Sequence, residues 1–239
     1  MNYTWDWSVL FQTPYFGYLL SGLMWTLLVA GAAWIIAFAW GSLLGIARTL
    51  DRPVIRALAG TYVEVFRGIP LLLHFFIWYF VFPELLPDPW GLWVKQDLPA
   101  PEYTTAVVAL GMYTAARVAE QVRSGIQALP KDLVNAGLAV GLTPRQNYLY
   151  IRLPIAFRII IPPLTSEFLT IFKNSALALT IGVLELTARA REIQNLTFQG
   201  FEAYTAATVL YLGITLCVVL LMRAIDRRTR IPGFLEGRS

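Results

Sequence analysis

The sequence has few of the side chains on which most soluble active sites depend. Its 239 residues include one cysteine, Cys217, and one histidine, His74. One thiol and one imidazole cannot build a disulfide framework or a zinc site, and no aspartate near His74 suggests a catalytic triad. The lysines follow Val, Pro and Phe, so the Gly-Lys-Ser/Thr phosphate loop is missing. We therefore expect no metal site, no catalytic residues and no ATP hydrolysis by such a loop.

Charge is also scarce. Only 14% of the residues are charged and 57% are hydrophobic, against about 25% charged in an average soluble domain. No charged residue occurs from Gly17 to Ala47, and about 20 apolar residues suffice to cross a bilayer. This stretch is too long for a cleaved signal peptide and no basic residue precedes it, so we expect the N-terminus to be retained.

The apolar pattern predicts an all-α membrane protein with five transmembrane helices. They are expected at about residues 17–47, 54–82, 104–126, 155–172 and 204–222. Pro70 should kink the second span, and the short apolar stretch 176–186 favours a helix packed within the protein. Residues 1–17 are rich in aromatic side chains, which is typical of an interfacial segment, with a disordered tail as the alternative.

Basic residues predict the orientation, because cytoplasmic loops are enriched in Lys and Arg. They gather after the first, third and fifth spans: Arg48, Arg52, Arg56, Lys131, Arg145, Arg152, Arg158, Arg223, Arg227, Arg228 and Arg230. The opposite loops hold far fewer. We expect the N-terminus outside and the C-terminus inside, so the net charge of +4 indicates orientation rather than nucleic-acid binding.

Residues 129–154, in a loop expected to face the cytoplasm, have the pattern of a helical hairpin. Gly141 suits the end of a first helix. Thr143 and Pro144 suit the start of a second, as N-cap and first helical residue. Pro154 would then begin the fourth span.

This hairpin resembles the cytoplasmic signature of ABC importer permeases, Glu-Ala-Ala-x3-Gly-x9-Ile-x-Leu-Pro. The matching residues have the same spacing: Asn135-Ala136-Gly137, Gly141 and Ile151-x-Leu153-Pro154. In that family the loop forms a coupling helix that sits in a cleft of the ATPase subunit. The resemblance implies ATPase-coupling roles for Asn135, Ala136, Gly137, Gly141, Leu142, Thr143 and Pro144. Two residues depart from the signature: Asn135 stands in the place of the family's Glu, and Gly137 stands in the place of its second Ala. Asn135 can make a polar contact to the ATPase in place of an ion pair.

Three further segments resemble polar amino acid importers: Glu64-x-Phe66-Arg67-Gly68-x-Pro70-Leu71-Leu72, Ala119-Glu120-x-x-Arg123-x-Gly125-Ile126 and Phe172-Lys173-Asn174-Ser175. Residues 114–123 and 173–175 look most like glutamate/aspartate permeases. The resemblance covers about residues 18–230 and implies a permease domain of the type I importer fold there. Residues 1–17 would be a periplasmic interfacial segment and residues 231–239 a cytoplasmic tail.

The resemblance implies a permease subunit of an ATP-driven importer of glutamate or aspartate in the bacterial inner membrane. The chain itself would hold no cofactor, because ATP and magnesium would bind two partner ATPase subunits. A second related permease, forming a heterodimer rather than a homodimer, and a periplasmic amino-acid-binding protein would complete the assembly. The alternatives are a permease for neutral polar amino acids such as glutamine, an ion-coupled secondary carrier, whose folds usually show internal repeats, and a membrane-embedded enzyme.

Charged residues inside spans point to the substrate site, because each costs about 2.5–3.5 kcal/mol at the bilayer centre and usually faces protein or water. Arg117 lies near the middle of the third span and can receive a substrate carboxylate. A purely structural ion pair with Glu120, one turn away, is the alternative, although Glu120 can equally pair with Arg123. We count Arg117 and Glu120 as substrate-binding candidates.

Other polar residues of the spans complete the candidate site. Lys173, Asn174 and Ser175 end the fourth span, and Lys173 beside a neutral Asn174 suits an anionic substrate; reaching the outer headgroups is the alternative for Lys173. His74 can bond a substrate or a neighbouring helix. Glu64 and Arg67 are expected to form a structural ion pair.

Overall fold

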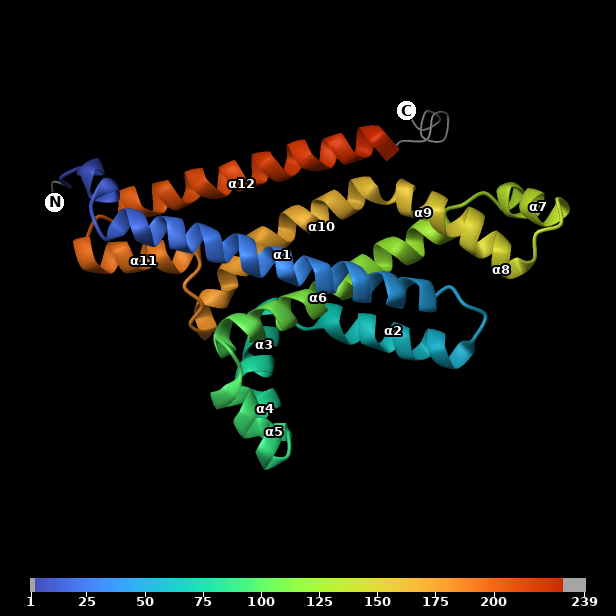
Figure 1. The fold of residues 1–239 in the computed structure, drawn as a ribbon, viewed down its shortest axis with the longest axis horizontal. Coiled ribbons are helices and arrows are strands. Elements are labelled where there is room, and N and C mark those ends of the chain that lie inside the picture. Colours follow the sequence, from blue (N-terminus) through green and yellow to red (C-terminus); the bar gives the residue numbers. More distant parts are fainter. Residues whose placement is uncertain (1–2, 230–239) are drawn as a thin grey trace.

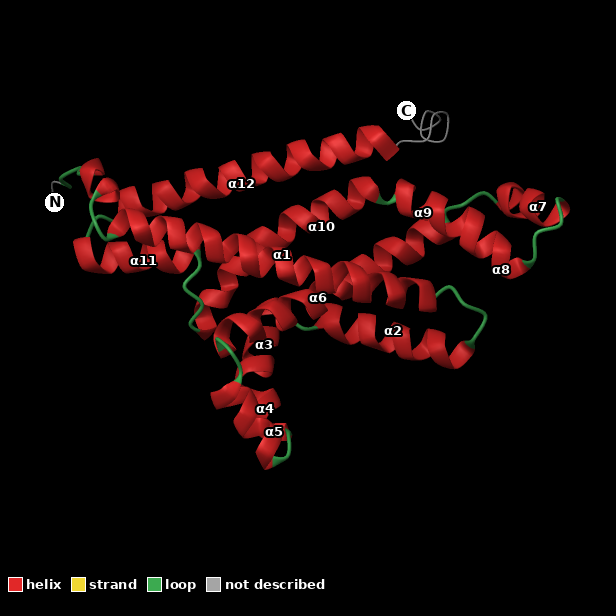
Figure 2. Ribbon diagram, in the orientation of Figure 1, coloured by secondary structure: helices red, strands yellow, loops and turns green. Residues whose placement is uncertain are grey.

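The computed structural model describes residues 3–229, and all of the regular elements in that range are helical (Figures 1 and 2). Arg230 and the predicted tail, residues 231–239, lie outside the described residues. The longer helices are α1 (Tyr15–Ala47), α2 (Pro53–Gly68), α6 (Pro101–Gln127), α7 (Lys131–Ala139), α10 (Ile161–Asn174), α11 (Leu186–Thr197) and α12 (Gly200–Thr229).

Shorter helical segments connect the long ones. They are η1 (Trp7–Phe11), α3 (Leu71–Phe76), η2 (Ile77–Val81), α4 (Phe82–Leu85), α5 (Asp88–Leu92), η3 (Trp93–Asp97), α8 (Pro144–Asn147), η4 (Tyr148–Arg152), α9 (Leu153–Ile159) and η5 (Ser175–Ile181). The hairpin of α7 and α8 lies at the opposite end of the molecule from the N-terminus, and α4 and α5 project away from the long helices (Figure 1).

Helices α1 and α6 form the centre of the bundle, and small residues let their backbones approach closely. A Cβ on Gly41 would lie 2.6 Å from the carbonyl oxygen of Ala115, and a Cβ on Gly45 would lie 2.6 Å from that of Ala119. Small residues four apart are the usual solution for helix contacts in lipid, where water does not drive apolar side chains together. The Gly41–Gly45 pair therefore sets the distance between the two helices.

The second predicted span is broken rather than kinked. Helix α2 ends at Gly68, Ile69 and Pro70 are extended, and the following helical segment leaves at 105° to α2. Proline lacks the N–H that would continue the helix and disfavours a helical conformation in the residue before it. The expectation of one continuous helix with a kink at Pro70 was wrong, although the position of the break was correct.

The fourth predicted span also differs from the structure. Helical structure runs from Pro144 to Ile159 through Pro154, and the bend of 55° comes after Ile159, where Pro162 opens the first turn of α10. The five-residue π-helical turn η4 ends directly before Leu153-Pro154. Its wider helical hydrogen bonding accommodates the missing N–H of Pro154. Pro154 therefore does not begin the span.

The segment after α10 contains more helix than the sequence pattern indicates. The short packed helix expected at residues 176–186 is the 3₁₀ helix η5, which ends at Gly182 with a φ of +94°. The following region was expected to be an outer loop but forms α11, because Glu185 caps it by accepting hydrogen bonds from the backbone N–H groups of Thr187 and Ala188 at 2.9 and 2.7 Å.

The aromatic N-terminal segment is tied to α12. The hydroxyl of Tyr3 donates to Glu202, and the backbone N–H of Asp6 donates to the same carboxylate at 2.9 Å. Glu202 is fully buried, so these bonds satisfy a carboxylate that would otherwise be costly to bury. From Tyr3 onward the segment is therefore ordered, and the disordered-tail alternative does not apply.

Two described helices, α1 and α12, are long and apolar enough to cross a membrane, and the number rises to four if each bent pair counts as one span. Helix α6 has 27 residues, about 40 Å at 1.5 Å per residue, which is also long enough to cross a bilayer. It differs from α1 in carrying Arg117, Glu120 and Arg123.

Replacing Gly41 with Ala should lower the free energy of unfolding by about 1–3 kcal/mol, because the new methyl group would overlap the Ala115 carbonyl. Thermal unfolding of the purified chain in detergent measures this. Gly31→Ala is the matched control on the same helix, since nothing lies within 4 Å of its Cβ position. Equal stability of the two variants would contradict the packing described here.

Candidate functional site

An ion pair inside the bundle joins α6 to α10. The guanidinium of Arg117 donates from Nε to Glu167 Oε2 at 2.6 Å and from Nη2 to Glu167 Oε1 at 3.1 Å. The Glu167 side chain is 8% exposed and that of Arg117 is 40% exposed. This is the bidentate geometry that an arginine makes with a carboxylate, and it leaves part of the Arg117 side chain exposed.

Glu120 is not the partner of Arg117, in contrast to the structural alternative drawn from the sequence. It accepts hydrogen bonds from Arg48, at the end of α1, and from Arg123, one turn later on α6. The pairing with Arg123 was expected as an alternative and is confirmed. Arg117 and Glu120 therefore belong to two separate clusters on α6, and Glu120 lies with Arg48 at the end of the bundle.

His74 contacts aromatic side chains of two helices. It is 3% exposed, and its ring centroid lies 5.1 Å from that of Phe66 on α2 and 5.3 Å from that of Tyr113 on α6. Its Nδ1 lies 3.3 Å from the carbonyl oxygen of Pro70. Because Tyr113 precedes Arg117 by one turn on α6, His74 connects the break at Pro70 to the helix that carries Arg117.

The three polar residues at the end of α10 have different environments. Lys173 is exposed, Asn174 is half-buried, and Ser175 is fully buried with its hydroxyl donating to the Phe172 carbonyl at 2.8 Å. Lys173 follows Glu167 by six residues, about 9 Å along a helix. The structure therefore places His74 against Tyr113, one turn before Arg117 on α6, and places Lys173 more than one turn beyond the Glu167 partner of Arg117.

Glu167 and Tyr113 were missed as parts of this cluster. A lone carboxylate in the middle of an apolar helix was the available signal for Glu167, since such a group needs a cationic partner. Tyr113 had no signal of its own. The predicted ion pair between Glu64 and Arg67 is absent among residues 3–229, because both side chains are exposed and lie apart.

The hairpin of α7 and α8 has the local structure predicted from the sequence. Gly141 follows α7 with a φ of +90°, a conformation that favours glycine. Thr143 caps α8 in a capping box with Gln146, and Pro144 occupies the first turn. Backbone chemistry at Gly141, Thr143 and Pro144 thus shapes the connection between the two helices.

The interior of this hairpin explains one departure from the family signature. Gly137 is buried, and a Cβ there would lie 2.4 Å from Nδ2 of Asn147. That nitrogen donates to the Val134 carbonyl at 2.8 Å, and Asn147 is 2% exposed. The amide of Asn147 therefore fills the space that an alanine side chain would need at position 137.

The outer face of the hairpin is exposed and partly apolar. Val140 is 80% exposed and Leu138 is 43% exposed. Asn135, Ala136, Gly141, Thr143 and Pro144 are also exposed. Of the remaining predicted coupling residues, Gly137 is buried and Leu142 is half-buried. Exposed apolar side chains on a short polar hairpin are typical of a surface that contacts another protein.

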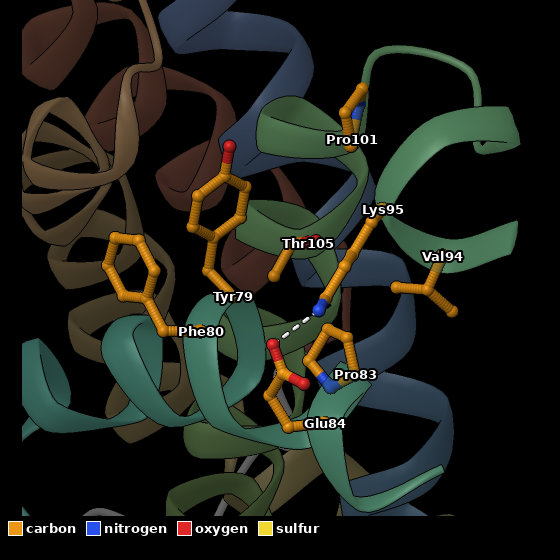
Figure 3. A pocket seen from close by; sticks show the side chains of 8 residues that line it. All are labelled: Tyr79, Phe80, Pro83, Glu84, Val94, Lys95, Pro101 and Thr105. Carbon is orange, nitrogen blue, oxygen red and sulfur yellow. Dashed lines mark hydrogen bonds and ion pairs between the residues drawn. The ribbon is translucent and has the colours of Figure 1, made fainter. Parts of the chain in front are cut away.

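A cavity of about 210 Å³ lies where the projecting segment meets α6, and Figure 3 shows its lining. Lys95 and Glu84 form an ion pair across it, with Tyr79 and Thr105 on the inner wall. None of the six predicted substrate-binding residues is among those that line it. The pair holds the η3 segment to α4, so this cavity belongs to the anchoring of the projection.

Comparison with known proteins identifies the family. Residues 37–231 match the family model described as "Binding-protein-dependent transport system inner membrane component". The chain belongs to this family. As a member of this permease family it is an ABC transporter subunit and not an enzyme, and the ATPase is a separate subunit.

Individual permeases are similar over nearly their whole length. The "Glutamate/aspartate import permease protein GltJ" of Escherichia coli (strain K12) is 42% identical over 246 residues, covering 100% of both chains. The "Glutamine transport system permease protein GlnP" of the same strain is 31% identical, covering 95% of this chain and 98% of the relative. The "Glutamate/aspartate import permease protein GltK" of Escherichia coli O157:H7 is 32% identical, covering 95% and 99%.

Solved structures have the same fold as this permease. The crystal structure of an amino acid ABC transporter with histidines matches with a TM-score of 0.81 at 30% identity, covering 95% of this chain and 100% of that chain. An inward-facing MetNI methionine ABC transporter matches with a TM-score of 0.76 at 21% identity, covering 92% and 100%. The architecture is therefore the all-helical type I ABC importer permease fold.

Glu167→Gln should lower the stability of the permease by roughly 1–3 kcal/mol, because it leaves the Arg117 guanidinium partly buried without its carboxylate. Because the Arg117 side chain is 40% exposed, this loss of stability is smaller than the loss expected on breaking a fully buried ion pair. The double variant Arg117→Gln with Glu167→Gln should recover most of the loss. Thermal unfolding in detergent measures all three proteins.

Glu64→Gln serves as the control, since Glu64 is exposed on α2 and makes no ion pair within the described residues. If Glu167→Gln and Glu64→Gln unfolded at the same temperature, the Arg117–Glu167 pair would have no stabilising role.

Proposed function

We propose that this permease imports glutamate or aspartate, driven by ATP, across the bacterial inner membrane, with five spans, the N-terminus outside and the C-terminus inside. The observation that carries the proposal is the full-length similarity to a glutamate/aspartate import permease at 42% identity. Glutamine is the second candidate substrate, supported by a lower identity of 31% to a glutamine permease. The ion-coupled carrier and enzyme alternatives have no support from the family.

The position of the basic residues supports the proposed orientation. Several segments lie toward the same end of the molecule, away from the N-terminus (Figure 1). They are the end of α1, the start of α2, the hairpin of α7 and α8 and the end of α12. These segments carry most of the Lys and Arg residues outside the spans. Retention of such residues in the cytoplasm would place the hairpin where an ATPase can reach it.

The proposed assembly has two permeases, two ATPases and a periplasmic amino-acid-binding protein. Two different permeases of Escherichia coli that carry a glutamate/aspartate import name are both similar to this chain. This favours a heterodimer with a second, related permease. ATP and magnesium would bind the partner ATPases, and the exposed face of the hairpin around Val140 would dock into them.

The proposed substrate site centres on Arg117. Glu167 occupies one edge of the guanidinium through Nε and Nη2, so a substrate carboxylate would bind at the remaining edge or replace Glu167 during transport. Lys173 and the amide of Asn174 would add positive charge and hydrogen bonds further along α10, with Ser175 shaping the backbone turn into η5. His74 would act through Tyr113, and Glu120 through its cluster with Arg48.

Arg117 would pair with Glu167 in one arrangement and with the substrate carboxylate in the other. Exchange between these two arrangements would contribute to alternating access. A substrate changes the balance of two conformations only by binding them with different affinity. An anionic substrate competing with Glu167 for the same guanidinium supplies such a difference, because α6 and α10 lose their direct ion pair when substrate is bound.

Uptake of radiolabelled glutamate by vesicles that contain the complete complex tests the site. The variant Arg117→Gln with Glu167→Gln removes both charges, so no buried carboxylate is left unpaired. It should lose at least about 90% of glutamate uptake, in line with a charge-assisted bidentate contact of roughly 1.5–3 kcal/mol.

The matched control is Lys95→Gln with Glu84→Gln, which removes another ion pair far from Arg117. It should transport normally. Normal uptake by the Arg117/Glu167 double variant, with the complex assembled, would rule out a substrate role for Arg117.

Val140→Asp should abolish co-purification of the ATPase and transport, because a charge is placed in the centre of the apolar docking surface. It should not affect folding, since Val140 is 80% exposed. Phe198→Asp, at an 85% exposed position between α11 and α12 at the other end of the molecule, is the control and should retain the ATPase. Retention of the ATPase by Val140→Asp would contradict the proposed docking surface.

A further inference from the structure

A second pocket, of about 510 Å³, lies between the bundle and the α7–α8 hairpin. Helices α2, α6 and α7, the turn η4 and the two residues that follow α1 contribute polar side chains to its wall. These side chains are those of Arg48, Thr49, Arg56, Gln127, Lys131, Asn135 and Arg152. The pocket thus joins the ends of α1 and α6 and the start of α2 to the predicted coupling helix α7.

The pocket is strongly cationic. Four of its lining residues are Lys or Arg and none is Asp or Glu. Of these four, only Arg48 forms an ion pair within residues 3–229, with Glu120, and that carboxylate is shared with Arg123. The Nε of Arg152 is buried and has no hydrogen-bond partner among the described residues. A buried guanidinium N–H is costly to leave unpaired, so Arg152 can donate to an acceptor from outside the described residues.

Apolar side chains form the rest of the pocket lining. They are Ile126, Leu129 and Val134. A basic pocket at the ends of spanning helices, lined in part by apolar side chains, suits a ligand with a negatively charged head and apolar tails. A free phosphate would use the cations but not the apolar surface.

We propose that this pocket binds the phosphate group of an anionic phospholipid from the inner leaflet, such as phosphatidylglycerol or cardiolipin. This proposal takes one element from the proposed function, which is the orientation that places the pocket on the cytoplasmic side of the membrane. Arg48 and Arg56 belong to the bundle, whereas Lys131 belongs to α7 and Arg152 to the helical turn that follows α8. A bound phosphate therefore bridges the bundle and the hairpin and fixes the position of the coupling surface.

Native mass spectrometry of the full-length chain, purified in mild detergent, tests the site without requiring transport. Phosphatidylglycerol or cardiolipin is added, with phosphatidylcholine as the neutral lipid, and bound lipid is titrated. The variant Arg56→Gln with Lys131→Gln removes two exposed cations that make no ion pair within the described part of the chain. At about 1 kcal/mol for each cation, affinity for the anionic lipid should fall by roughly 30-fold, with no change for phosphatidylcholine.

Arg227→Gln with Arg228→Gln is the matched control, because it removes two exposed cations at the end of α12, outside the pocket. It should retain the wild-type affinity. An equal loss of lipid affinity in both double variants would mean that anionic lipid is attracted generally to the basic ends of the helices. Unchanged affinity in Arg56→Gln with Lys131→Gln would mean that the lipid binds elsewhere. Either result overturns the proposal.

Two further arms separate the lipid from other occupants. Inorganic phosphate or glycerol phosphate that displaces the lipid at millimolar concentration would make the pocket a soluble-phosphate site and overturn the lipid assignment. Displacement of the lipid by the ATPase subunit would make the pocket part of the ATPase interface, with the same consequence. Failure of glutamate uptake by the wild-type complex would overturn the proposed function while leaving the measured lipid affinity intact.

Discussion

The close approach of α1 and α6 is the constraint on which the remaining structure depends. It is possible only because Gly41 and Gly45 have no side chains where the Ala115 and Ala119 carbonyls pass. In a membrane, such contacts replace the burial of apolar surface that stabilises soluble bundles. The same contact positions Arg117, two residues beyond Ala115, and brings Arg48 at the end of α1 to Glu120.

Charges on α6 therefore form two clusters. The Arg117–Glu167 pair connects α6 to α10, and in the proposed function an anionic substrate would compete there for the guanidinium. The Arg48–Glu120–Arg123 cluster ties the end of α1 to α6. Helix α6 carries residues of both clusters.

Sequence patterns predicted the parts of this structure that depend on neighbouring residues. Gly141, Thr143 and Pro144 set the hairpin through local backbone chemistry, and the apolar stretches located α1, α6 and α12 closely. The partner of Arg117 was not predictable in this way, because Glu167 lies 50 residues away and meets it only through tertiary packing. The 105° turn at Pro70 and the helix α11 likewise depend on neighbours, since a proline marks a break without fixing its angle.

In the proposed function, this chain couples ATP hydrolysis by its partner subunits to the import of an acidic amino acid. The ATPase rate of the complete complex in lipid vesicles tests this coupling, with the binding protein supplied in turn with glutamate, aspartate and glutamine. We expect stimulation by glutamate or aspartate and little by glutamine. Equal stimulation by glutamine, or none by any of the three, would contradict the proposed function.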